Sequence, residues 1–105
     1  MANNKPPRRY WHILVPQREY PRPKFHIGQQ VGSHWQDEDG NPQYDIGIII
    51  GMAYGARGYN QPEWTYLLRW LKCDSDPEIL GTDDGNFVYE SSLVADSTVI
   101  NSNLQ

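Results

Sequence analysis

Short β-prone runs separated by glycine, proline and acidic turns point this chain toward an all-β fold. Nine glycines and eight prolines are spread over 105 residues, and a run such as 48–50 is typical of its apolar stretches in length. A membrane-spanning helix needs about 20 consecutive apolar residues, so we expect no membrane span and no apolar core of a signal peptide. No stretch repeats its apolar residues at helical spacing. The length predicts one domain.

Residues 25–96 are expected to form a small barrel of about five short strands. The β-prone segments are 25–35 with a turn at Gly28, 44–54, 64–71, 87–89, and the end of 90–96, which begins with a 3₁₀ turn; Ile79 and Leu80 suggest a further edge strand. Alternation along a strand sends successive side chains to opposite faces. The core side is therefore predicted to carry Ile46, Ile48 and Ile50 in the strand 44–54. In the strand 64–71 both faces carry apolar groups, which suits a central strand; one face groups Trp64, Tyr66, Leu68 and Trp70.

The first 24 residues differ sharply from the rest in charge and in proline content. They hold six basic side chains against one acidic, a net +5, whereas residues 25–105 hold three against twelve, a net −9. Five of the eight prolines also lie there, and proline fixes φ and removes a donor. We expect an extended basic arm over 1–24 with one short strand at 10–15, where β-propensity is high. A polar tail follows at 97–105.

The segments FHIGQQV, YDIGIIIGMAY, WTYLLRWL and YESSLV, in that order, resemble the strands and closing 3₁₀ turn of an SH3-like barrel of the Tudor or KOW kind. The chain is also similar to short proteins of cyanobacteria and their mobile elements. The resemblance covers residues 25–95, about two-thirds of the chain, and leaves the arm outside. It implies a small barrel with a binding role, and it carries over no catalytic residue.

Enzymatic chemistry finds little support in the residue pattern. His12, His26 and His34 do not follow a metal-ligand spacing, and a nucleophilic Cys73 would need a paired base that the sequence does not indicate. A single cysteine also excludes a disulfide within the chain. We interpret the paired acidic residues as solvent-exposed turn residues, whose charge also discourages edge-to-edge aggregation. We therefore predict a protein that is not an enzyme and holds no metal or cofactor.

Aromatic side chains around one loop form the first candidate binding site. Loop-end rings beside acids can line a groove for a proline-rich or cationic peptide, or a cage for a methylated ammonium. The candidate protein-binding residues are Tyr54, Tyr59, Glu63 and Trp64. The alternative is that the rings belong to the core; that alternative is favoured for Trp35 and Trp70 and left open for Tyr59 and Trp64.

The arm is the second candidate site. Its candidate contact residues are Arg8, Arg9, Trp11, Arg18, Arg22 and Lys24. Basic side chains interleaved with rings suit a nucleic-acid backbone, but they also suit the acidic face of the same barrel, of a second copy or of a larger assembly.

We predict a cytoplasmic, non-enzymatic protein-interaction module or accessory subunit. It would bind a partner protein through the arm and the loop aromatics, with a homo-oligomer left open. The alternative is a nucleic-acid-binding accessory protein that uses the basic arm. The first is favoured because a body of net charge −9 repels phosphate except along the arm.

Overall fold

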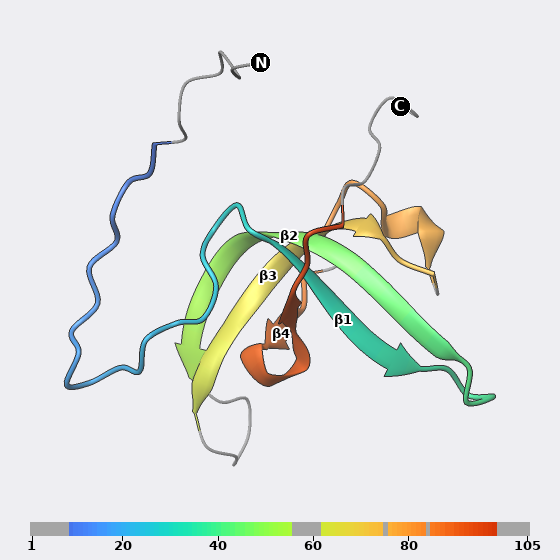
Figure 1. Ribbon diagram of the computed structural model, residues 1–105, viewed down its shortest axis with the longest axis horizontal. Coiled ribbons are helices and arrows are strands. Elements are labelled where there is room, and N and C mark those ends of the chain that lie inside the picture. The colour runs from blue at the N-terminus through green and yellow to red at the C-terminus, as the bar shows by residue number, and fades with distance from the viewer. Residues whose placement is uncertain (1–8, 56–61, 75, 84, 99–105) are drawn as a thin grey trace, which may run out of the picture.

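The computed structural model describes residues 9–55, 62–74, 76–83 and 85–98. They form one antiparallel sheet in the order β4-β3-β2-β1-β5 (Figure 1). The strands are β1 (Gln30–Gln36), β2 (Pro42–Gly55), β3 (Glu63–Lys72), β4 (Phe87–Tyr89) and β5 (Val94–Ala95), with 3₁₀ turns η1 (Pro77–Ile79) and η2 (Glu90–Ser92). The all-β class and the five strands predicted from the sequence are confirmed. Among the described residues β4 and β5 remain the two edges, so the sheet is open and the predicted closure into a barrel is not observed.

The β1–β2 hairpin is fixed by its acidic turn. One carboxylate oxygen of Asp37 accepts the backbone N–H groups of Asp39 at 3.0 Å and Asn41 at 2.9 Å, and Gly40 takes the left-handed φ of +80° that the turn needs. The backbone hydrogen bond from Asn41 is the largest effect on the pKa of Asp37, which lies below its ordinary value. These acids therefore serve a turn, as expected.

Alternation along β3 builds the core. The side chains predicted to share one face, Trp64, Tyr66, Leu68 and Trp70, are all buried. This confirms Trp70 as a core residue and assigns Trp64, which the sequence left open, to the core. These side chains pack with buried residues from the other elements, namely Phe25, Val31, Ile49, Cys73 and Leu93. Trp35 does not belong to this cluster: it is half-buried, and its indole N–H donates to the buried carboxylate of Asp45 at 2.9 Å. The expectation that Trp35 is a core residue is therefore wrong.

The face of β2 that lies against the core is not the one predicted from its isoleucines. Ile49 is fully buried in the core, and Gly47, which pairs with Val31 of β1, lies on the same side. Ile46 and Ile48 pair with residues of the opposite face, where Ile46 is buried and Ile48 half-buried. A Cβ on Gly47 would lie 3.1 Å from the Cβ of Leu68. Gly47 therefore lies on the core side, where it leaves room for the large side chains of β3. A register shift between Ile49 and Gly51 places Gly51 opposite Leu67 on the other face, and Ile50 is half-buried.

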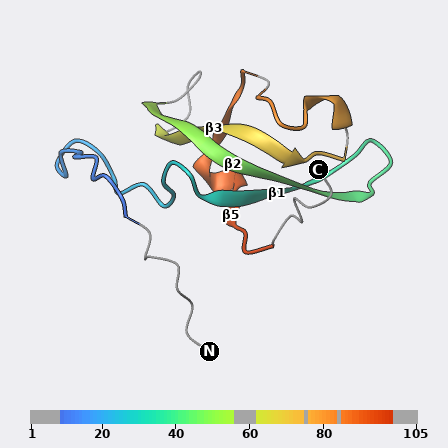
Figure 2. The ribbon, with the colours of Figure 1, turned by 90° about the horizontal axis from the view of Figure 1, so that it is seen from above.

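Two predicted strands are absent from the described residues. Residues 10–15 form no strand, because a β-prone segment needs an edge to pair with, and these residues stand away from the sheet (Figures 1 and 2). The predicted turn at Gly28 is confirmed: Gly28 has φ +91°, and its N–H donates to the carbonyl of Ile49 at 2.8 Å, so that the first strand begins only at Gln30. Ile79 lies in η1 instead of an edge strand, because Pro77 opens a 3₁₀ turn there.

Candidate interaction surface

Three aromatic rings hold the base of the arm against the end of β2 and β3. The ring of Tyr20 lies edge-on to that of Tyr54, with centroids 5.1 Å apart, and 6.2 Å from that of Trp64. Tyr54 and Trp64 are themselves 5.2 Å apart, also edge-on. The carbonyl of Pro21 accepts the indole N–H of Trp64 at 2.8 Å. The arm is therefore built into the body at this point.

The structure brings together part of the predicted aromatic patch, but inside the molecule. Trp64 is only 8% exposed and Tyr54 is half-buried beneath the arm. The carboxylate of Glu63 accepts the backbone N–H and the hydroxyl of Ser91, each at 3.1 Å. Tyr59 lies outside the described residues. These side chains position the arm and η2, and the indole N–H of Trp64 and the carboxylate of Glu63 already have partners within the chain.

Glu90 forms a second attachment for the arm. One of its carboxylate oxygens accepts the phenolic hydrogen of Tyr66 at 2.6 Å and the backbone N–H of Lys24 at 2.9 Å. The next residue, Phe25, enters the core with its ring 5.6 Å from that of Tyr66. Burial of Tyr66, followed by its hydrogen bond to Glu90, raises the pKa of that phenol. Residues 20–25 are thus fixed by a ring cluster, a carboxylate and the core.

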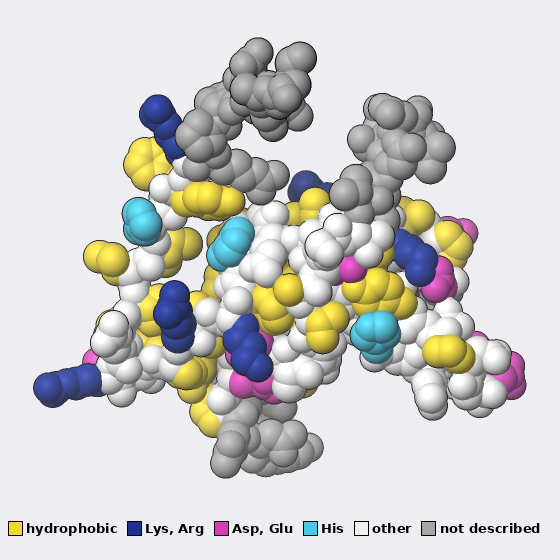
Figure 3. All heavy atoms as spheres, in the orientation of Figure 1, with side chains coloured by type: hydrophobic (Ala, Val, Ile, Leu, Met, Phe, Trp, Pro, Cys, Tyr) yellow, Lys and Arg dark blue, Asp and Glu magenta, His cyan; other side chains and the backbone are white. Residues whose placement is uncertain are grey.

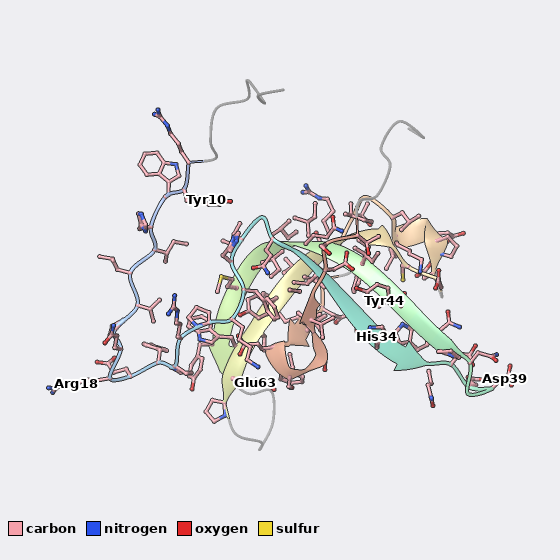
Figure 4. All side chains as sticks on the ribbon, viewed as in Figure 1. Tyr10, Arg18, His34, Asp39, Tyr44 and Glu63 are labelled. Atoms are coloured by element: carbon pink, nitrogen blue, oxygen red, sulfur yellow. The ribbon has the colours of Figure 1, made fainter. Side chains whose placement is uncertain are left out.

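The distal arm, residues 9–15, presents large apolar side chains to solvent. Trp11 is 97% exposed, Leu14 91% and Ile13 71%. The arm reverses direction where the carbonyl of Pro16 accepts the backbone N–H of Tyr20 at 3.2 Å. Figure 4 shows Tyr10 back beside the start of the sheet, where its ring lies 5.6 Å from that of His26. The exposed segment is therefore held at both ends and covered by nothing within the described chain.

Basic side chains accompany these apolar ones along the arm (Figure 3). The predicted arm contacts Arg9, Trp11, Arg18, Arg22 and Lys24 are all exposed, and Arg8 lies outside the described residues. Over the ranges that the structure describes, the sole ion pair joins Lys72 to Asp74, at 3.4 Å. The charges of the arm are therefore not neutralised by the body of the same chain.

A cavity of about 450 Å³ lies where the distal arm approaches the sheet. Its lining residues are Tyr10, His26, Gly28, Gln29, Gln30, Ile48, Ala95, Asp96 and Ser97. The carboxylate of Asp96 accepts a hydrogen bond from the phenolic hydroxyl of Tyr44 and another, at 2.7 Å, from the side-chain amide of Gln30. Burial of Tyr44, followed by its hydrogen bond to Asp96, raises the pKa of that phenol to about 12. Burial also pushes the pKa of Asp96 upward, but the hydrogen bonds from Tyr44 and Gln30 outweigh it and leave that pKa below its ordinary value.

This network is structural. The ring of Tyr44 stacks on that of His34 at 4.3 Å and covers Gly32, so its hydroxyl reaches past β1 to the residue that follows β5. Among the described residues no group of three His, Cys, Asp or Glu side chains is arranged to hold a metal ion. Cys73 is buried in the core.

The residues that position the arm were missed by sequence reasoning. Tyr20 and Pro21 contact Trp64 from more than forty positions away, and Glu90 meets Lys24 across 66 positions. The sequence feature that could have indicated this anchor is Tyr20 with prolines at positions 21 and 23, within an otherwise basic segment.

Comparison of the chain with models of protein families, with curated proteins and with solved structures finds no match. No helix in the described part of the chain is long and apolar enough to cross a membrane.

Proposed function

We propose that the protein is a non-enzymatic interaction module that binds a partner protein through its distal arm. The observation that carries this proposal is the exposure of Trp11, Ile13 and Leu14 on a segment held at both ends. Contiguous exposed apolar side chains mark interaction sites, since leaving them in water forfeits the free energy of burial. Because the segment is already extended and tethered, a partner would lose less entropy in ordering it.

We also propose that the body is an SH3-like sheet, a scaffold that carries the arm. The order of elements supports this interpretation: β1 to β4 are neighbours in sequence, η2 follows β4, and β5 returns to pair with β1. Val31 and Gly32 pair with Ala95 and Val94 at this return. The functional residues then lie on the arm, and the rings of the body hold its base.

A photo-crosslinking amino acid placed at position 11 tests the interaction. We expect the modified chain, expressed in its native cells, to form an adduct of defined mass that an excess of the unmodified chain suppresses. The matched control carries the same group at Asp39, an exposed residue of the β1–β2 turn. In a second variant, Ile13→Ser combined with Leu14→Ser should abolish the adduct formed from position 11.

Two results would reject the proposal. One is that position 11 forms no saturable adduct. The other is that positions 11 and 39 label the same proteins to the same extent, which would indicate random collision. Far-UV circular dichroism of each variant verifies that the sheet is intact, and the exposure of the substituted side chains predicts that it is.

Nucleic-acid binding is the second candidate, favoured by arm cations that are exposed and form no ion pair with the described body. Arg9, Arg18 and Arg22 would contact phosphates, and Trp11 would stack on a base. The test is fluorescence anisotropy with single-stranded and duplex oligonucleotides over a range of salt. Arg→Gln variants are preferable to deletion of the arm, because Tyr20 and Phe25 belong to the packed structure. Absence of binding at low salt rejects this function.

A further inference from the structure

We infer that the partner of the distal arm is a second copy of this chain. Each arm would lie on the connection between β3 and β4 of the other copy, at its described residues 76–83, with two such contacts in a reciprocal dimer. This inference rests on the proposed function, since it takes the arm as the binding element and names what it binds.

The arm provides an apolar centre with a basic rim. Trp11, Ile13 and Leu14 are largely exposed, and Arg9 and Arg18 flank them on the same tethered segment. An apolar centre supplies most of the affinity of an interface, and rim charges supply orientation and association rate. The surface that fits this element therefore has an exposed apolar side chain surrounded by acids.

The β3–β4 connection has that composition. Leu80 is 43% exposed, and Asp76, Glu78 and Asp83 are exposed around it in sequence. The connection is held in place by the end of β3: the N–H of Gly81 donates to the carbonyl of Trp70 at 2.7 Å, and the N–H of Trp70 donates to the carbonyl of Thr82 at 3.0 Å. It is a fixed acidic surface with an apolar centre, complementary to the arm in charge.

The two surfaces lie at opposite ends of the molecule. In both ribbon views the arm projects from one end, and η1 lies at the other (Figures 1 and 2). An arm and an acidic connection of one chain are therefore too far apart to meet, whereas two copies side by side in opposite directions bring both pairs together. Such a twofold arrangement is closed and is the commonest form of homo-oligomer.

Sedimentation equilibrium of the full chain over a range of concentrations tests the dimer. We expect a concentration-dependent dimer that weakens as salt is raised, because rim charges are screened. Arg9→Glu with Arg18→Glu should weaken it roughly tenfold, as should Asp76→Lys with Glu78→Lys, and combining the two pairs should restore it. Leu14→Ser and Leu80→Ser should each weaken the dimer at every salt concentration.

The matched control is Glu38→Lys with Asp39→Lys, which makes the same change in net charge on the exposed β1–β2 turn. It should leave the dimer largely intact, and a loss as large as that from the connection would overturn the assignment. A chain that stays monomeric at all concentrations overturns it too, as does a dimer indifferent to both charge reversals. A monomer whose residue 11 still crosslinks another protein refutes self-association alone, whereas failure of both experiments refutes the proposed function as well.

Discussion

Tyr66 donates its phenolic hydrogen to Glu90 at 2.6 Å, and this bond links the centre of the core to the arm. Tyr66 is fully buried, so its hydroxyl depends on this acceptor. The same carboxylate oxygen accepts the backbone N–H of Lys24 at 2.9 Å. One side chain therefore satisfies a buried donor of β3 and fixes the point at which the arm joins the sheet.

We predict that Glu90→Gln lowers the free energy of unfolding by about 1–3 kcal/mol, because hydrogen bonds to a charged acceptor are stronger than those to an amide. Urea denaturation measures the change. Glu38→Gln is the matched control, since Glu38 is exposed in the β1–β2 turn, and it should stay within about 0.5 kcal/mol of the wild type. Equal effects of the two substitutions would contradict the role given to Glu90.

Gly32→Ala should displace the ring of Tyr44. A Cβ at position 32 would lie 2.4 Å from ring carbons of Tyr44, so the ring must move and its bond to Asp96 must break. We expect a loss of about 1–3 kcal/mol in urea denaturation. The control is Gly51→Ala in β2, whose Cβ would lie 3.4 Å from that of Leu67.

A double-mutant cycle separates this clash from a general effect of alanine in a strand. Gly32→Ala should cost much less when Tyr44 is already alanine, because nothing then occupies the space above the glycine. Additive effects would show that the ring of Tyr44 does not cover position 32.

The bond between Tyr44 and Asp96 predicts a loss of stability at both extremes of pH. The pKa of Tyr44 is raised from 10.0 to about 12, so its contribution is complete below pH 10 and is lost as the pH rises toward 12. The pKa of Asp96 is lowered from 3.8, so its contribution is present above that value and is lost as the pH falls through the lower pKa of the folded state.

Urea midpoints measured across pH for the wild type and for Tyr44→Phe test this dependence. The difference between the two proteins should shrink above pH 10 and again below pH 3.8. A difference that is constant across the whole range would mean that the two groups are not coupled in the folded protein.

The grouping of side chains on one face could be predicted for β3, whereas the buried face of β2 could not. Trp64, Tyr66, Leu68 and Trp70 recur at every second position, and this alternation correctly groups them on one face. In β2 the alternating isoleucines predict the wrong core face, because Gly47 makes room there for Leu68 of β3. That contact belongs to the partner strand and is not visible in β2 alone.

The arm illustrates the same limit for the candidate site. Its charge follows from composition, and the sequence predicted Trp11 as a contact residue; that the side chain is exposed is known only from the structure. The anchoring of Tyr20 on Trp64 depends on two segments more than forty residues apart, which no local pattern reports. Strand propensity at 10–15 likewise did not produce a strand, because propensity describes how a residue fits a sheet and does not supply a neighbouring edge.

Tyr20→Ala should release the arm from the sheet. Each lost ring pair removes about 0.5–1.5 kcal/mol of stabilisation, and 1.4 kcal/mol corresponds to a tenfold change in an equilibrium. Local opening around Lys24 should therefore become about tenfold more frequent, and tryptic cleavage after Lys24 should accelerate by a similar factor.

Cleavage after the exposed Arg9 serves as the internal reference and should not change, because Arg9 lies beyond the anchor. Tyr10→Ala, which loses only a ring contact with His26, is the matched variant and should leave cleavage after Lys24 slow. If both substitutions accelerate it equally, the three-ring cluster is not what holds the arm in place.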